Sequence, residues 1–134
     1  MRKPVRIALL LLLTIPALSR AATDIGVDSI LSPSGDGRQY VWFTPKALWH
    51  NYGTMPSSFR AWLVLSDSFW SIEHRDSVTV ANLAPGSDTV VEFDPYYFPK
   101  ASIWMAKCST YALGDTNPSN DAMTRFCNIW PWNI

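Results

Sequence analysis

The sequence contains only two cysteines and two histidines among its 134 residues, and it has no run of like charges. Neither His50 nor His74 stands at a spacing from a cysteine, an aspartate or the other histidine that is typical of a metal site. The chain also lacks the Gly-x-Ser-x-Gly, His-Glu-x-x-His and phosphate-loop motifs. These absences predict a protein that is not an enzyme and that has no catalytic residues.

The first 21 residues have the layout of a secretory signal peptide. Three basic residues precede an apolar run over residues 7–18, which is too short to span a bilayer comfortably. Small residues at positions 19 and 21 predict cleavage after Ala21, so residues 22–134 should form the mature protein. An uncleaved membrane anchor is the alternative. We therefore expect a secreted or cell-surface protein without a stable membrane span.

The charge of the mature chain argues against a nucleic-acid partner. Four of the 11 basic residues lie in the expected signal peptide, which leaves 7 basic against 11 acidic residues and a net charge of about −4. All 7 Trp, 5 Tyr and 6 Phe lie in the mature chain. Because this is more aromatic surface than a single small domain usually buries, we expect some rings to be exposed.

Turn residues recur at short intervals and leave no room for a long helix. Hydrophobic alternation places Phe59, Leu63 and Leu65 on one face of a strand and Trp62 on the other. The pattern predicts one all-β domain over residues 22–134, an immunoglobulin-like antiparallel β-sandwich, in preference to a closed barrel. We expect about seven strands, near residues 24–31, 41–50, 57–66, 76–83, 87–94, 101–113 and 121–130, with Trp49, Phe59, Phe93 and Trp104 in the core.

The last two expected strands form a hairpin around the turn-forming residues 114–121. If Asp115 pairs with Asn120, the numbers of paired residues sum to 235, and Cys108 then lies opposite Cys127. This register predicts a Cys108–Cys127 disulfide, which suits an oxidising destination. The alternation does not decide whether the disulfide would face the core.

Oxygen-bearing side chains alternate through the same turn, as they do in a calcium loop. The sixth and twelfth positions hold Asn120 and Phe126, where such a loop needs glycine and an acidic ligand. Solvated turn residues are therefore the leading interpretation, and no other cofactor is expected. A weak calcium site is the alternative, with the candidate ligands Asp115, Asn117, Ser119 and Asp121.

Several aromatic residues lie near turns or at the Trp-rich C-terminal tail, where flat rings can contact a sugar or another protein. The candidates for such an interface are Trp70, Tyr96, Tyr97, Trp130 and Trp132.

Three turn motifs occur in order along the chain: Asn51-Tyr-Gly53, Leu83-Ala-Pro-Gly86 before a Val-rich strand, and an acidic turn over residues 114–121. Together they resemble the CARDB-like modules, which are cell-adhesion-related immunoglobulin-like domains of bacteria and archaea. The match covers most of residues 24–128 and leaves out Cys127 and the tail 128–134. The resemblance implies a sandwich fold and a role in extracellular adhesion or assembly.

We therefore expect a secreted, non-enzymatic module for cell-surface adhesion or structural assembly. Its partner would be a second copy of the chain, a cell-surface protein or a glycan. The alternative is a small carbohydrate-binding module that stacks sugars on exposed Trp and Tyr rings.

Overall fold

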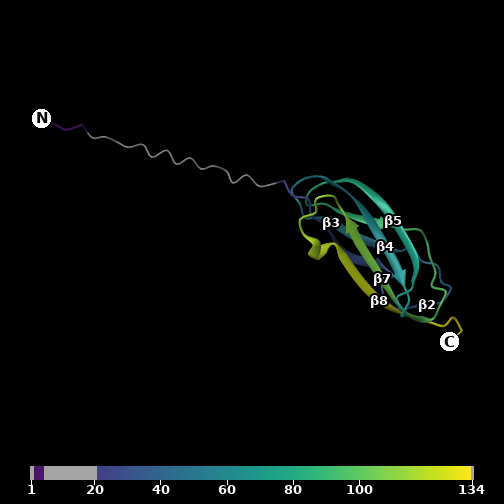
Figure 1. The fold of residues 1–134 in the computed structure, drawn as a ribbon. Coiled ribbons are helices and arrows are strands. Elements are labelled where there is room, and N and C mark those ends of the chain that lie inside the picture. The colour runs from purple at the N-terminus through teal and green to yellow at the C-terminus, as the bar shows by residue number, and fades with distance from the viewer. Residues whose placement is uncertain (1, 5–20, 134) are drawn as a thin grey trace.

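Eight strands in two layers make up the chain in the computed structural model, which describes residues 2–4 and 21–133 (Figure 1). Most of the expected signal peptide lies outside the described residues. One sheet has the order β1-β3-β6 and the other the order β2-β8-β7-β4-β5. The strands are β1 (Ile25–Ser32), β2 (Gly37–Arg38), β3 (Lys46–Asn51), β4 (Ser57–Ser66), β5 (Ile72–Leu83), β6 (Asp88–Glu92), β7 (Ser102–Tyr111) and β8 (Ala122–Trp130), with a 3₁₀ turn η1 (Pro118–Asn120).

All strand pairs are antiparallel except the short β2–β8 pair. The predicted all-β antiparallel sandwich is therefore confirmed. Strand β4 begins and ends where the sequence predicts, whereas β3 begins at Lys46 and not at residue 41. Proline has no N–H to donate to a ladder, so Pro45 stops the strand from extending towards the N-terminus. Strand β5 begins at Ile72, four residues before the predicted start at residue 76.

The core lies between the two sheets and follows the predicted alternation. Phe59, Ala61, Leu63 and Leu65 of β4 are buried, and Trp62 points to the opposite side of its sheet. The four aromatic residues that we expect in the core are all buried: Trp49, Phe59, Phe93 and Trp104. Trp49 also satisfies its indole N–H, which donates to Thr110 Oγ1 at 2.9 Å.

The register of the β7–β8 hairpin differs from the prediction. The numbers of paired residues sum to 231, with Cys108 opposite Met123 and Cys127 opposite Trp104. The predicted sum of 235 is wrong because the centre of the hairpin lies two residues earlier than predicted: the pairing ends at Ser109 and Ala122, and η1 (Pro118–Asn120) belongs to the turn between β7 and β8. Cys127 pairs with Trp104, which lies four residues before Cys108 on β7. The two cysteines are therefore offset by about 13 Å along the strands.

The two cysteines are accordingly free thiols, and the predicted disulfide is not formed. A disulfide needs Cα atoms within about 7 Å of each other. Both side chains are buried in the core, so they serve as small hydrophobic residues in the packing.

Asn51 organises the turn after β3. Its amide donates to the carbonyl oxygens of Met55 and Leu83, at 2.9 and 2.8 Å, and its side-chain oxygen accepts from the backbone N–H of Gly53 at 2.8 Å. A Cβ at Gly53 would lie 2.3 Å from the carbonyl oxygen of Ala22. Glycine is therefore required there by close approach of two chain segments.

Candidate functional site

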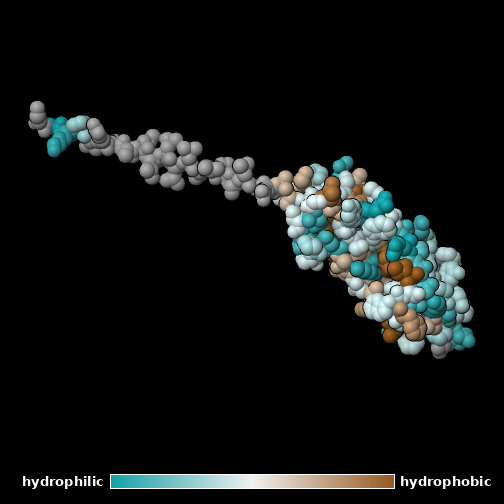
Figure 2. All heavy atoms as spheres, in the orientation of Figure 1, coloured by the Kyte–Doolittle hydropathy of each residue, from teal (hydrophilic) through white to brown (hydrophobic). Residues whose placement is uncertain are grey.

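The outer face of the five-stranded sheet is apolar and cationic. At the paired ladder positions of β4, β5, β7 and β8 this face carries no acidic residue. The guanidinium of Arg60 lies 5.7 Å from the ring centroid of Trp62, a cation–π contact. Figure 2 shows hydrophobic residues, in brown, exposed at several places beside hydrophilic ones. The residues of this face are Trp62, Val64, Ile72, Ile103, Met105, Tyr111, Phe126 and Trp130, with the cations Arg60, Arg75 and Lys107.

A hollow of about 220 Å³ opens on this face where β7 and β8 meet the loop after β4. Its apolar walls come from Ile103, Phe126 and Trp70, which are 52%, 61% and 68% exposed. We call it the Trp70 hollow, and its lining residues are Asp67, Ser68, Trp70, Ile103, Met105 and Phe126.

Asp67 holds the loop that displays Trp70. Its carboxylate accepts from the backbone N–H groups of Phe69 and Ser71, and it forms an ion pair with Lys100 at 3.2 Å. Although burial opposes the charge, these hydrogen bonds and the lysine hold the pKa of Asp67 below its ordinary value. Trp70 itself has a φ of 62°, in the left-handed region that a non-glycine residue seldom adopts, and its side chain is exposed.

The structure brings two of the predicted interface residues to the same place. Trp70 and Trp130 both flank Ile103, because Trp130 lines an adjoining hollow of about 340 Å³ with Ile103 and Pro131. Trp132 follows in the tail and is 61% exposed. Ile103 and Phe126 were not among the predicted interface residues. Once Trp104 and Cys127 are known to face the core, strand alternation places both of these residues outside.

Tyr96 and Tyr97 lie elsewhere, in the loop after β6. Tyr96 is half-buried and stacks on His74 at 4.4 Å between ring centroids, and burial raises its pKa. Tyr97 packs edge-on against Trp42 at 4.7 Å. Tyr40 and Trp42 pack against Tyr97 and have exposed rings, although neither was among the predicted interface residues.

Three of the four predicted calcium residues are linked by hydrogen bonds within their own turn. The side-chain oxygen of Asn117 accepts a hydrogen bond from the backbone N–H of Ser119 and so caps η1. Asp115 accepts from the backbone N–H groups of Ile25 and Asn117, both at 2.9 Å. The pKa of Asp121 is raised, most of all by burial and then by the negative charges of Asp115 and Asp24. The charges that act on Asp121 are therefore those of Asp115 and Asp24.

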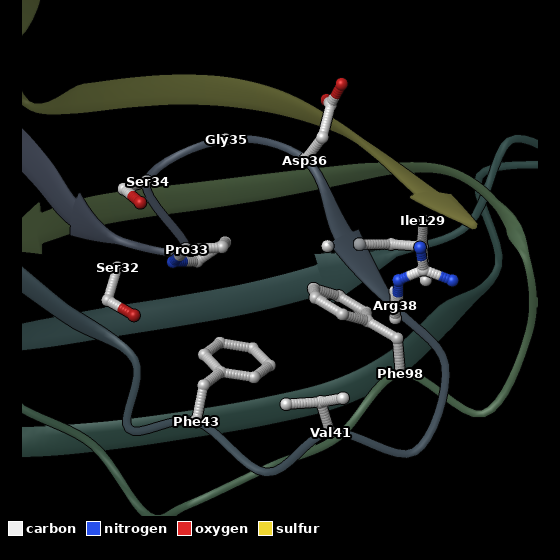
Figure 3. A pocket seen from close by; sticks show the side chains of 11 residues that line it. Ser32, Pro33, Ser34, Gly35, Asp36, Arg38, Val41, Phe43, Phe98 and Ile129 are labelled. Atoms are coloured by element: carbon white, nitrogen blue, oxygen red, sulfur yellow. The ribbon is translucent and has the colours of Figure 1, made fainter. Parts of the chain in front are cut away.

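A separate pocket of about 170 Å³ lies beside β2 (Figure 3). The rings of Phe43 and Phe98 stack at 5.0 Å and face this pocket, and Arg38 and Asp36 lie near it. Pockets for organic ligands usually measure about 300 Å³ or more. This pocket is smaller than that, so it does not fit a typical organic ligand.

Neither cysteine has the surroundings of a nucleophile. Burial raises the pKa of Cys108 to about 12 and also raises that of Cys127. The thiolate is the reactive form of cysteine, so both groups are inert at neutral pH.

These features define a small immunoglobulin-like β-sandwich with an apolar, cationic outer surface. The solved structure of the CARDB domain of the PF1109 protein from Pyrococcus furiosus, in complex with di-metal ions, has this fold. It matches with a TM-score of 0.62 and 12% identity, over 81% of this chain and 94% of that one. The chain therefore has the fold of a CARDB domain.

Two further solved structures are less similar. The putative ApaA protein from Bordetella pertussis matches at a TM-score of 0.43 and 13% identity, over 79% of this chain and 89% of that chain. The β-glucuronidase of Parabacteroides merdae matches at 0.44 and 10% identity, over 79% of this chain but only 13% of its own length. No protein-family model matches the sequence, and a search of curated proteins gives no match.

Among residues 2–4 and 21–133, no helix has the length and hydrophobicity that crossing a membrane would require.

Proposed function

We propose that this chain is an exported, non-enzymatic immunoglobulin-like module that assembles with other copies of itself at the cell surface or outside the cell. The observation that carries the proposal is the exposed apolar surface around the Trp70 hollow. Exposed aromatic and aliphatic side chains that cluster on one face of a soluble domain are typical of protein contact surfaces, and Trp, Phe, Met and Arg are enriched there.

A second copy of the chain offers a complementary surface. The outer face of the three-stranded sheet carries Asp28, Asp88 and Glu92, and Lys46 pairs across the ladder from Glu92. This acidic face is opposite in charge to the face that holds Arg60, Arg75 and Lys107. When two different faces of one molecule attract each other, the contact is head-to-tail, and repetition builds a ring or a filament.

The free edges of the sheets offer a further route to assembly. Strand β5 ends one sheet, and β1 and β6 end the other. An edge strand presents unpaired backbone donors and acceptors, so another strand can pair with it at little cost.

Light scattering on size-fractionated protein tests the proposal. We expect a mass that rises with protein concentration, and we expect Phe126→Glu to hold the chain at the mass of a monomer. Leu113→Glu is the matched control, since Leu113 is 86% exposed but lies in the loop after β7 and outside the proposed face. A wild-type mass that stays at 15.1 kDa or at the mass of the processed chain over the whole concentration range would contradict self-assembly.

Carbohydrate binding is the second candidate function. It is favoured by the exposure of Trp42 and Trp70, at 65% and 68%, because a flat exposed ring can stack on a sugar. A glycan array separates the two candidates. A specific signal that Trp70→Ala or Trp130→Ala abolishes would favour sugar binding, whereas concentration-dependent oligomers without any array signal would favour assembly.

We also propose a weak calcium site between η1 and the start of β1, made by Asp24, Asp115 and Asp121. The side-chain oxygens Asn120 Oδ1 and Asp121 Oδ1 are buried and accept no hydrogen bond. A cation would relieve the repulsion between these carboxylates. We expect calcium to raise the melting temperature of the wild-type chain but not of Asp121→Asn. An equal rise in both proteins would argue against the site.

A further inference from the structure

Three side chains with metal-binding atoms converge on the outer face of the three-stranded sheet. They are Asp28 of β1, His50 of β3 and Asp88 of β6, and their ligand atoms all lie within 4.8 Å of one another. The three residues are far apart in the sequence, so the cluster is created by the pairing of the strands.

The register of the sheet explains why these side chains meet. His50 pairs directly with Asp88 across the β3–β6 ladder, and with Gly26 on its other side. The register shifts between Val27 and Ser29, so Asp28 is the extra residue of a bulge. Asp28 is exposed, whereas the preceding Val27 faces the core. Bulges of this kind redirect a side chain, and here the bulge turns a carboxylate towards the histidine.

Glycine at position 26 keeps space beside the cluster. A Cβ there would lie 2.9 Å from the Tyr52 ring and 2.9 Å from the Asn120 amide. The Tyr52 ring would then have to move, and it packs against the His50 ring with 4.3 Å between centroids. The position of the imidazole therefore depends on the small residue opposite it.

Two of the three groups contact each other, and the third is held by a neighbour outside the cluster. His50 Nδ1 contacts the carboxylate of Asp88, and the hydroxyl of Tyr52 donates to the carboxylate of Asp28. Metal ligands in proteins are commonly oriented in this way by a second hydrogen-bonding group. The His50 side chain is 23% exposed and that of Asp88 57%, so an ion in solution can reach them.

We propose that Asp28, His50 and Asp88 bind one divalent transition-metal ion of the Zn²⁺ class. One imidazole nitrogen and two carboxylate oxygens are donors that Zn²⁺ and its neighbours accept readily, whereas Ca²⁺ and Mg²⁺ prefer oxygen alone. In a tetrahedral zinc site with bonds of about 2.0–2.1 Å, ligand atoms are about 3.3 Å apart. Side-chain rotations would bring the three ligand atoms, all within 4.8 Å of one another, to this spacing, with His50 and Asp88 moving apart to admit the ion. Water would complete the coordination.

Binding of the ion replaces the contact between His50 Nδ1 and Asp88. The proton in that contact leaves for solvent, and the nitrogen lone pair and the carboxylate then face the metal. The Tyr52 hydroxyl keeps its hydrogen bond to Asp28 and continues to orient that ligand.

Calorimetric titration with zinc chloride tests the site on the chain purified without a polyhistidine tag. We expect one ion per chain, and we expect His50→Ala and Asp88→Asn each to weaken the affinity by more than about tenfold. Glu92→Gln is the matched control, because Glu92 lies on the same strand and the same face but outside the cluster. Its affinity should equal that of the wild type.

Cobalt absorption gives a second readout that a change in stability alone would not move. Bound Co²⁺ should produce a visible band in the wild type and in Glu92→Gln, and zinc should remove the band while calcium should not. Circular dichroism checks that each variant is folded, and repeating the titration on Phe126→Glu separates metal binding from self-assembly. The proposal is overturned if the wild type takes up no zinc, if His50→Ala binds like the wild type, or if calcium displaces cobalt.

Discussion

At the scale of single residues, Asn51 shows how one buried side chain can hold a turn. It is fully buried, and it makes three hydrogen bonds to backbone groups of three other residues. Removing one partner of a buried hydrogen bond leaves the other partner without a bond and without water, which costs about 1–3 kcal/mol.

We therefore expect Asn51→Ala to lower the free energy of unfolding by about 2–4 kcal/mol, since several backbone groups lose their partner together. Chemical denaturation measures this change. Asn128→Ala is the control, because Asn128 is exposed on β8 and should alter stability little. Equal midpoints for the wild type and Asn51→Ala would show that the turn does not depend on this amide.

Tyr52 gives a prediction on pH dependence. Its hydrogen bond to Asp28, with smaller contributions from burial and from the charges of Asp28, Asp88 and Asp24, raises its pKa from 10.0 to about 12. Because the pKa of the folded state is raised, the stabilisation is fully present below about pH 10 and is lost as the pH rises through about 12.

We expect Asp28→Asn to move the pKa of Tyr52 back towards 10.0. The ring resonances of Tyr52, followed by NMR during an alkaline titration, measure this shift for the single residue. Added salt should move the wild-type pKa in the same direction, since the ring is on the surface and its charges are screened. An unchanged pKa in Asp28→Asn would remove the carboxylate as the cause.

The candidate residues were partly predictable. Exposed aromatic residues near turns are recognisable from sequence, and Trp70, Trp130 and Trp132 are indeed exposed. Asp28, His50 and Asp88 were not predictable as a group, because their proximity depends on the β1–β3–β6 order and on a bulge in β1. No spacing along the chain encodes either feature.

At the scale of elements, the strands follow from alternation and turn chemistry, whereas the register of a hairpin depends on the length of its turn. The inner face of strand β4 carries Phe59, Ala61, Leu63 and Leu65 at every second position, as the sequence predicts. The β7–β8 register could not be predicted in the same way, because both faces of β7 carry apolar side chains. The observed and predicted registers differ by a slip of two residues on each strand, and such a slip leaves every side chain on the same face of the sheet.

The register leads to a prediction about the thiols. Cys108 and Cys127 should not react with a thiol reagent in the native protein, because both are buried and burial raises their pKa values. After unfolding in denaturant without reductant, two thiols per chain should react at once. Absorbance after addition of a chromogenic disulfide reagent counts them. Unfolded chains that react only after reduction would show that the cysteines are bonded and that the register is wrong.

At the scale of the whole molecule, the two outer faces differ in charge. One carries Arg60, Arg75 and Lys107 with exposed apolar residues, and the other carries Asp28, Asp88 and Glu92. Molecules with one cationic and one acidic face attract one another at low ionic strength. At 0.1 M salt, charges that are more than about 10 Å apart are largely screened, so the attraction weakens.

We expect added salt to weaken self-association without abolishing it, because the apolar contact around the Trp70 hollow does not depend on charge. Sedimentation at several salt concentrations measures the effect. Lys107→Glu should remove most of the salt dependence, and Lys46→Glu, on the opposite sheet, should leave the association intact or strengthen it. Association that is independent of salt in all three proteins would exclude the charge contribution.

The described chain enters the sandwich at one end and leaves it at the other (Figure 1). Strand β8, the last, runs along the axis between these ends, and β1, the first, pairs with β3 in the other sheet. Tension applied between the two ends would therefore load the β1–β3 and β7–β8 ladders in shear, so that many hydrogen bonds must break together. A molecule of this geometry resists pulling along its length far better than peeling from one side.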